Sequence, residues 1–209
     1  MNLVVFFAIF LVNFVPSYHC WQSIRRIAKK GRSSSARFLN INDEVPSGTV
    51  DIVTGSLSEK FASFREDVSF KELLKTHAKA IVFALPGAYN PLCSARHLPG
   101  FVQNAAMLRE VYGVDAIYCV SVNDKYVLKA WGESTKDWRG SGVDLVADGN
   151  AEFVKAVGYI KDVSRFRMSI RSRRWASIVE HGVVKWFELD GIGICDKSSA
   201  ENVIRYLKS

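Results

Sequence analysis

The sequence predicts an α/β protein with a central mixed sheet flanked by helices. Apolar runs of strand length at residues 81–85, 114–122 and 143–147 alternate with segments whose apolar residues recur at helical spacing. Two further strand-like runs, 175–180 and 183–189, are joined by a His-Gly dipeptide, which is typical of a tight hairpin turn. Strands that alternate with helices, and then end in a hairpin and a helix, favour one sheet covered on both faces.

Shorter signals place the remaining elements. We expect a strand over 50–53, and the run Ser69-Phe-Lys-Glu has the spacing of a capping box that starts a short helix. Further helices are expected over 93–113, 124–131 and 151–158, and a last one after the Ser-Ser-Ala-Glu run at 198–201. From the helix at 124–131 and the last helix, the residues expected to face the core are Tyr126, Val127, Ala130, Val203, Ile204 and Leu207.

The stretch 81–101 carries the main chemical signal. A buried strand stops at Pro86-Gly87, and Cys93 then falls in the first turn of the following helix. Amide groups at a helix N-terminus favour an anion, and thiols placed there can have a pKa several units below the free value. A packed, inert cysteine is the more frequent case. The stiff approach through Pro86, Gly87 and Pro91 nevertheless favours a reactive thiolate.

This stretch resembles the active-site segment of type II peroxiredoxins, the branch that includes the fifth animal subfamily. The matching residues are Leu85-Pro-Gly-Ala-Tyr-Asn-Pro-Leu-Cys-Ser and His97-Leu-Pro-Gly-Phe-Val. The family pattern is Pro-x-x-x-Thr/Ser-x-x-Cys, and Asn90 stands where the hydroxyl residue belongs. The resemblance continues at 121–124, 131–132, 147–148 and 174–182, and it covers roughly residues 50–209. It implies a thioredoxin-like fold, which we place at 46–209.

The resemblance implies a thiol-dependent peroxidase with catalytic residues Cys93, Pro86, Asn90 and Arg174. The Cys93 thiolate would attack a hydroperoxide and become a sulfenic acid. Arg174 would supply the cation and donors, and Pro86 would shield the thiolate. A carboxamide at residue 90 can donate and accept, but only from separate atoms. The alternative is therefore a peroxide sensor, or a thiol-dependent binding module with weak turnover on the same fold.

Three other cysteines and one histidine need an assignment. Cys20 falls in the leader. Cys119 lies in an apolar strand, which predicts a buried, inert thiol. Its position nevertheless resembles that of a second cysteine in plant members of the family. Cys195 follows a glycine-containing segment near the resolving cysteine of animal members, so it is a candidate resolver. His97 could serve a cysteine–histidine hydrolase, but the resemblance implies a structural role for it.

The sequence suggests no metal site or cofactor, because it has no Cys-x-x-Cys motif and no zinc-like Cys/His spacing. The resemblance implies a hydroperoxide substrate, an external thiol such as glutathione with glutaredoxin as reductant, and a homodimer. The runner-up is a disulfide to Cys195 that thioredoxin reduces.

The N-terminal region has a composition of its own. Residues 1–20 contain a short apolar run typical of a signal peptide, and residues 21–45 are a basic, transit-like segment and linker. The resemblance favours the apicoplast, a secondary plastid, as the destination, because apicomplexan members of the family carry such a leader. The alternatives are the secretory pathway, a mitochondrion or an uncleaved anchor. Six basic residues precede the first acidic one, so the net charge of +7 leaves about +1 for the rest. The charge balance therefore does not support nucleic-acid binding by a basic domain. We also expect the mature domain not to bind a membrane.

Overall fold

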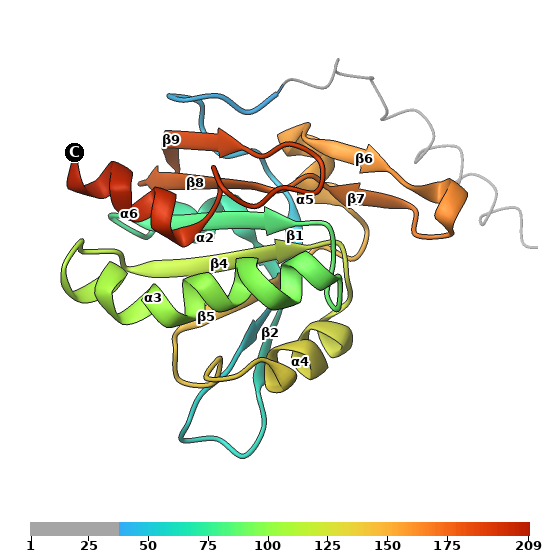
Figure 1. Cartoon of the computed structure of the whole chain (residues 1–209), viewed down its shortest axis with the longest axis horizontal. Coiled ribbons are helices and arrows are strands. Elements are labelled where there is room, and N and C mark those ends of the chain that lie inside the picture. The colour runs from blue at the N-terminus through green and yellow to red at the C-terminus, as the bar shows by residue number, and fades with distance from the viewer. Residues whose placement is uncertain (1–37) are drawn as a thin grey trace, which may run out of the picture. The chain divides into compact units, whose positions relative to one another are not determined.

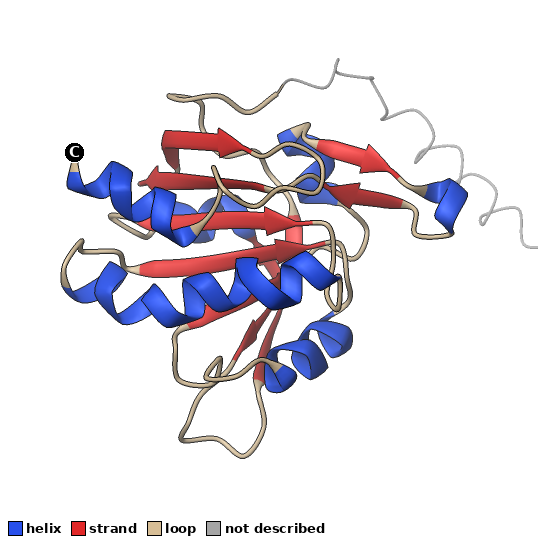
Figure 2. Cartoon of the chain, viewed as in Figure 1, coloured by secondary structure: helices blue, strands red, loops and turns tan. Residues whose placement is uncertain are grey.

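The computed structural model describes residues 38–209, which form a sheet with helices on both faces (Figure 1, Figure 2). The seven strands follow the order β2-β1-β5-β4-β3-β8-β9. Their bounds are β1 Thr49–Thr54, β2 Ser63–Ser69, β3 Ala80–Leu85, β4 Ala116–Ser121, β5 Val143–Ala147, β8 Trp175–Glu180 and β9 Val183–Leu189. The pairs β3–β4 and β4–β5 are parallel, and the pairs β1–β2, β1–β5, β3–β8 and β8–β9 are antiparallel. The sheet is therefore mixed, as the sequence predicts.

The helices divide between the two faces of the sheet. Leu98–Glu110 (α3), Lys125–Ser134 (α4) and Ala200–Lys208 (α6) pack into one cluster of buried side chains. Phe70–Lys75 (α2) and Glu152–Val157 (α5) pack into the other. Along β3, Ile81, Phe83 and Leu85 join the first cluster, whereas Ala80, Val82 and Ala84 join the second. This alternation is the period-two pattern of a strand that is buried on both faces.

Several elements differ from the sequence prediction. The strand β2 was not predicted because its run Ser-Phe-Arg-Glu-Asp-Val-Ser is polar and lies at the edge of the sheet. The short strands Ile160–Asp162 (β6) and Ile170–Ser172 (β7) pair in a separate sheet around the turn Ser164–Phe166 (η2), and they were also missed. At α2, Ser69 occupies the N-cap position but its side chain makes no capping hydrogen bond, so the predicted capping box is wrong.

The buried face of α4 was predicted incorrectly. Tyr126 is exposed and Ala130 is exposed, whereas Leu128, Trp131 and Gly132 are buried. Asp124 caps this helix by accepting hydrogen bonds from the N–H groups of residues 126 and 127. The predicted inner face of α6 is confirmed, since Val203 and Ile204 are buried and Leu207 packs against the same cluster.

The predicted signal peptide lies outside the described residues, as does most of the transit-like segment. Leu39 and Val45 are buried, so chain that precedes residue 46 contributes to the packed unit. Within residues 38–209, none of the helices combines the length and the hydrophobicity that crossing a membrane requires.

Candidate active site

Cys93 lies where the sequence places it, just beyond the central strand β3. All six residues of β3 are buried, and the strand ends at Pro86-Gly87. After a turn, Cys93 opens a five-residue π-helical segment, Cys93–His97 (η1), in which the N–H of Leu98 donates to the Cys93 carbonyl. Such π-helical segments inside α-helices are frequent at functional sites. The Cys93 side chain is fully buried, so bulk water does not contact the sulfur.

The sheet brings Arg174 to this cysteine. β3 pairs with β8 so that Ala84 lies opposite Trp175, and Arg174 therefore reaches the end of β3. Its Nη2 donates to the Cys93 Sγ at 3.2 Å. The guanidinium is buried with the cysteine, where a charge-assisted hydrogen bond is stronger than in water. The predicted juxtaposition of thiol and cation is thus present.

His97 holds the other side of the guanidinium. Arg174 Nη1 lies 2.9 Å from the His97 Nδ1, and the His97 Nε2 lies 2.9 Å from the Ser198 carbonyl oxygen. Burial, reinforced by the charge of Arg174, lowers the pKa of His97 to about 3. The ring is therefore neutral near pH 7. Its polar contacts are with Arg174 and Ser198 and not with Cys93, so the geometry does not support a cysteine–histidine hydrolase.

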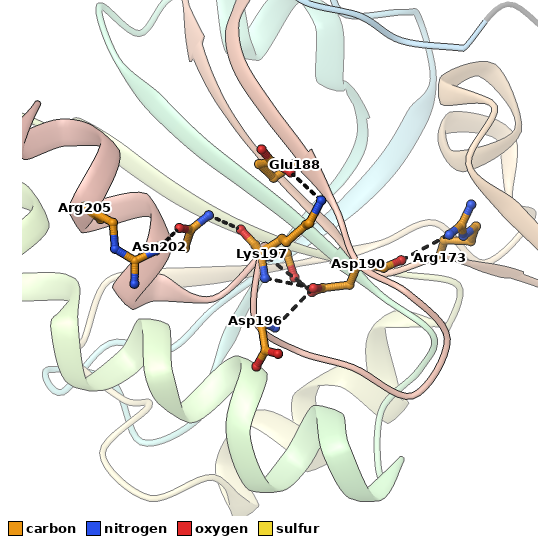
Figure 3. A network of polar contacts seen from close by, with 8 residues as sticks. Arg173, Glu188, Asp190, Asp196, Lys197, Asn202 and Arg205 are labelled. Carbon is orange, nitrogen blue, oxygen red and sulfur yellow. Dashed lines mark hydrogen bonds and ion pairs between the residues drawn. The ribbon is translucent and has the colours of Figure 1, made fainter.

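A buried carboxylate organises the loop beyond β9. Asp190 accepts hydrogen bonds from the N–H groups of Asp196, Lys197 and Ser198 and from the Ser198 hydroxyl (Figure 3). Burial opposes ionisation of Asp190, but these four hydrogen bonds lower its pKa below the ordinary value. The role of Asp190 could not be predicted from the sequence, because Asp190 lies in a glycine-containing run that is typical of a turn.

A cavity of about 570 Å³ lies next to these residues. The polar and charged side chains around it include those of Lys161, Arg171 and Arg174, and its apolar wall includes Phe166, Met168 and Ile192. Pro86, Asn90 and Leu92 also line it, whereas Cys93 does not. A small molecule in the cavity would therefore contact Arg174 but not the cysteine sulfur. Its approach to the sulfur requires the residues between the cavity and Cys93 to move.

Asn90 lies at the start of the active-site helix. Its backbone carbonyl accepts from the N–H of Ser94 at 2.9 Å, and its backbone N–H donates to Gly87. Within the described residues its carboxamide forms no hydrogen bond, although residue 90 lines the cavity. The side chain is thus free to interact with a molecule in the cavity.

The other two described cysteines are buried free thiols. Cys119 lies on β4 opposite Phe83 of β3, and burial raises its pKa well above the ordinary value. Burial also raises the pKa of Cys195 to about 11, and only 2% of that residue is exposed. Both are poor nucleophiles in this conformation. In the described part of the chain no cluster of three or more His, Cys, Asp or Glu side chains could hold a metal ion.

Comparison with known proteins identifies the family. The redoxin family model matches residues 41–204. The chain belongs to the peroxiredoxin family. Two chloroplastic peroxiredoxins are similar to it: peroxiredoxin-2E-2 of Oryza sativa is 46% identical over 131 residues, and peroxiredoxin-2E of Arabidopsis thaliana is 36% identical over 172. These alignments cover 62% and 81% of this chain, but only 57% and 69% of the two relatives.

A solved peroxiredoxin structure agrees with this assignment. Reduced Prx3 of Vibrio vulnificus in complex with hydrogen peroxide has a TM-score of 0.70 and 33% identity, with 82% of this chain and 97% of that chain covered. The thioredoxin-like fold of this peroxiredoxin is thereby confirmed. Membership of the family implies thiol-dependent peroxidase activity.

Proposed function

We propose that the protein reduces hydrogen peroxide and alkyl hydroperoxides through the Cys93 thiol. The Cys93 thiolate attacks one peroxide oxygen, an S–O bond forms, and the O–O bond breaks. The sulfur is oxidised to a sulfenic acid, and the other oxygen leaves with a proton as alcohol or water. The observation that carries this proposal is the 3.2 Å contact between the Arg174 guanidinium and the Cys93 sulfur.

Each of the predicted site residues has a role in this scheme. Arg174 stabilises the thiolate and the negative charge that develops on the departing oxygen, since its fixed fork can serve two acceptors. Asn90, on the cavity wall, takes the place of the family hydroxyl and can donate to the peroxide. Pro86 shields the thiolate from water. Catalysis also requires a local opening that admits peroxide to the buried sulfur.

The second candidate is a peroxide sensor or a thiol-dependent binding module. Two observations favour it: a carboxamide replaces the hydroxyl at residue 90, and the Cys93 side chain is fully buried. The two candidates predict different kinetics. Rapid, stoichiometric formation of the Cys93 sulfenate at low peroxide, followed by many turnovers with a thiol, supports the peroxidase. Slow oxidation without turnover supports the sensor or module.

An external thiol is proposed to recycle the sulfenate. The raised pKa of Cys195 leaves it protonated near pH 7, so glutathione with glutaredoxin is favoured over an internal disulfide reduced by thioredoxin. Cys119 is less suitable still as a resolver, because it is fully buried in β4.

A homodimer is proposed from the family resemblance. Sedimentation of the reduced and oxidised protein tests the dimer.

We further propose that a two-part leader directs the protein to a plastid. The apolar run in residues 1–20 and the basic segment in 21–45 have the composition of a signal and a transit peptide, and the names of the rice and Arabidopsis relatives specify the chloroplast. An apicoplast reached through the secretory route fits this order of segments. A fluorescent fusion of residues 1–45 tests it; location in a mitochondrion or secretion would contradict it.

A further inference from the structure

A closed ring of hydrogen bonds surrounds the active-site arginine. The Asp190 N–H donates to the Arg174 carbonyl, the Ser198 hydroxyl donates to the Asp190 carboxylate, and the His97 ring joins Ser198 to Arg174. Every member is buried: 1% of His97, 0% of Ser198, 2% of Asp190 and 6% of Arg174 is exposed. Water therefore competes little for these hydrogen bonds.

The position of each proton in the ring is fixed. Arg174 can only donate, so the His97 Nδ1 must accept and carry a lone pair. The proton of neutral His97 then resides on Nε2, which donates to the Ser198 carbonyl oxygen at 2.9 Å. The Ser198 hydroxyl donates a hydrogen bond to the Asp190 carboxylate. The Ser198 hydroxyl oxygen, 3.2 Å from the same Nε2, can therefore act as a second acceptor for His97. The opposite tautomer would aim an N–H at the guanidinium.

Asp190 also closes the loop that supplies those acceptors. Its Oδ1 accepts from the N–H of Asp196 at 3.1 Å and of Lys197 at 2.8 Å, and its Oδ2 accepts from the N–H of Ser198 at 3.2 Å. A carboxylate offers acceptors on both oxygens, whereas a carboxamide offers only one. Replacing the carboxylate by a carboxamide would therefore leave at least one of these N–H groups without its present partner.

We propose that Asp190 and Ser198 are positioning residues for the reaction at Cys93. They fix the loop 191–199 and the tautomer of His97, and His97 in turn directs Arg174 at the cysteine sulfur. This inference rests on the proposed peroxidase function. Within residues 38–209, the hydroxyl and carboxylate of these two residues form no hydrogen bond with the sulfur, so they act through His97. Asp190 also lines the cavity.

The same loop carries Cys195. The Asp190 carboxylate accepts hydrogen bonds from the three residues that follow Cys195. Loss of these hydrogen bonds would therefore loosen the chain around the Cys195 thiol as well. Loss of Asp190 should therefore have opposite effects on two cysteines. The reactivity of Cys93 falls, and the reactivity of buried Cys195 rises.

The test compares Asp190→Asn and Ser198→Ala with the unchanged full-length protein. We expect Asp190→Asn to slow oxidation of Cys93 by hydrogen peroxide, and its alkylation by iodoacetamide, by about 10- to 100-fold, as expected for a misplaced active-site group. Ser198→Ala should give a smaller loss in the same direction, because the Ser198 carbonyl still accepts from His97. Nitrogen NMR of the His97 ring should show protonated Nε2 in the unchanged protein and mixed tautomers in Asp190→Asn.

A matched acid-to-amide control is available on the same loop. Among residues 38–209 the side chain of Asp196 makes only an exposed ion pair with Arg96 at 3.8 Å, so Asp196→Asn should leave the Cys93 rates within about twofold of the unchanged protein. The inference is overturned if folded Asp190→Asn keeps both Cys93 rates and the His97 tautomer. If Asp190→Asn does not fold, folded Ser198→Ala with unaltered Cys93 rates and tautomer overturns it.

The alkylation and NMR readouts do not depend on peroxide chemistry. If the unchanged protein reacts slowly with peroxide, the proposed peroxidase function fails. The effects of Asp190→Asn on alkylation and on the His97 tautomer would still support the positioning roles, or their absence would overturn them. The two failures are thus distinguishable.

Discussion

Arg174 and Cys93 are separated by 81 positions in the sequence, yet a hydrogen bond of 3.2 Å joins the guanidinium to the sulfur. The antiparallel pairing of β3 with β8 produces this contact, because Arg174 immediately precedes β8 at the edge where β3 ends, and Cys93 follows β3 after a turn. The same guanidinium contacts His97 through its other terminal nitrogen. One planar group thus links the reactive sulfur to the hydrogen bonds that join His97, Ser198 and Asp190.

Replacement of Arg174 by Lys should slow oxidation of Cys93 by about 10²- to 10³-fold, the usual cost of one aligned donor in the transition state. An ammonium keeps the charge but cannot serve sulfur and imidazole through a fixed fork. Stopped-flow oxidation of the reduced protein measures the rate. Arg165→Lys is the matched control, because Arg165 is exposed and its charge lies over the ring of Phe166. A rate for Arg174→Lys equal to that of the control would contradict the assigned role.

Replacement of Asn90 by Thr should raise the rate of Cys93 oxidation by about tenfold or more, since an aligned donor to the reacting oxygen is worth ~10²–10³. The carboxamide of Asn90 makes no hydrogen bond within the described residues, so the replacement breaks none. Asn90→Val has the same shape as the Thr variant without the hydroxyl. Equal rates for the Thr and Val variants would show that the hydroxyl contributes nothing here.

Replacement of Cys195 by Ser should leave turnover with glutathione and glutaredoxin unchanged. The thiol is buried and its pKa is about 11, so it is largely protonated near pH 7. Steady-state turnover is measured with each reductant in turn. A loss of thioredoxin-dependent turnover in Cys195→Ser, together with a Cys93–Cys195 disulfide in the oxidised protein, would instead establish Cys195 as the resolving residue.

Protonation of His97 should destabilise the fold in acid. Its pKa falls from an ordinary 6.5 to about 3 in the folded protein. The unfolded chain therefore binds a proton between these values while the folded protein does not, and the free energy of unfolding decreases as pH falls through this range. The maximum effect is about 5 kcal/mol, because each pKa unit is worth about 1.4 kcal/mol.

Urea unfolding at about pH 7 and about pH 4 measures this dependence. The lowered pKa of Asp190 acts in the same direction, since its contribution is also lost as the carboxylate is protonated. His97→Gln isolates the histidine, because glutamine can accept from Arg174 and donate to the Ser198 carbonyl without titrating. A decrease in stability that is as large in His97→Gln as in the unchanged protein would rule out His97 as its source.

The sequence predicted the centre of the molecule better than its edges. Strands β3, β4 and β5 are continuous apolar runs and were located within two residues, as was the hairpin of β8 and β9. The strands β2, β6 and β7 are short or polar, and pairing rather than propensity forms them. The buried face of α4 was predicted incorrectly because the aromatic residue Tyr126 was expected in the core. It instead packs edge-on against Phe64 at the surface.

The candidate site was predicted in part for a similar reason. A local pattern locates Cys93 at a strand-to-helix corner, and the family resemblance adds Arg174. The partners of His97 and Asp190 could not be read from the sequence, because Ser198 lies 101 positions from His97 and ordinary loop residues surround it. Hydrogen bonds between distant segments leave no periodic pattern, so only the folded structure shows them.

The most direct test of the central claim is the second-order rate constant for oxidation of Cys93 by hydrogen peroxide. It is measured by stopped flow on the reduced protein, with mass spectrometry to locate the sulfenate, and is compared with the same chain unfolded in urea at the same pH. The account predicts a folded rate about 10³-fold above the unfolded rate, since aligned donors are worth about that much. Equal rates in the folded and unfolded chains would contradict it.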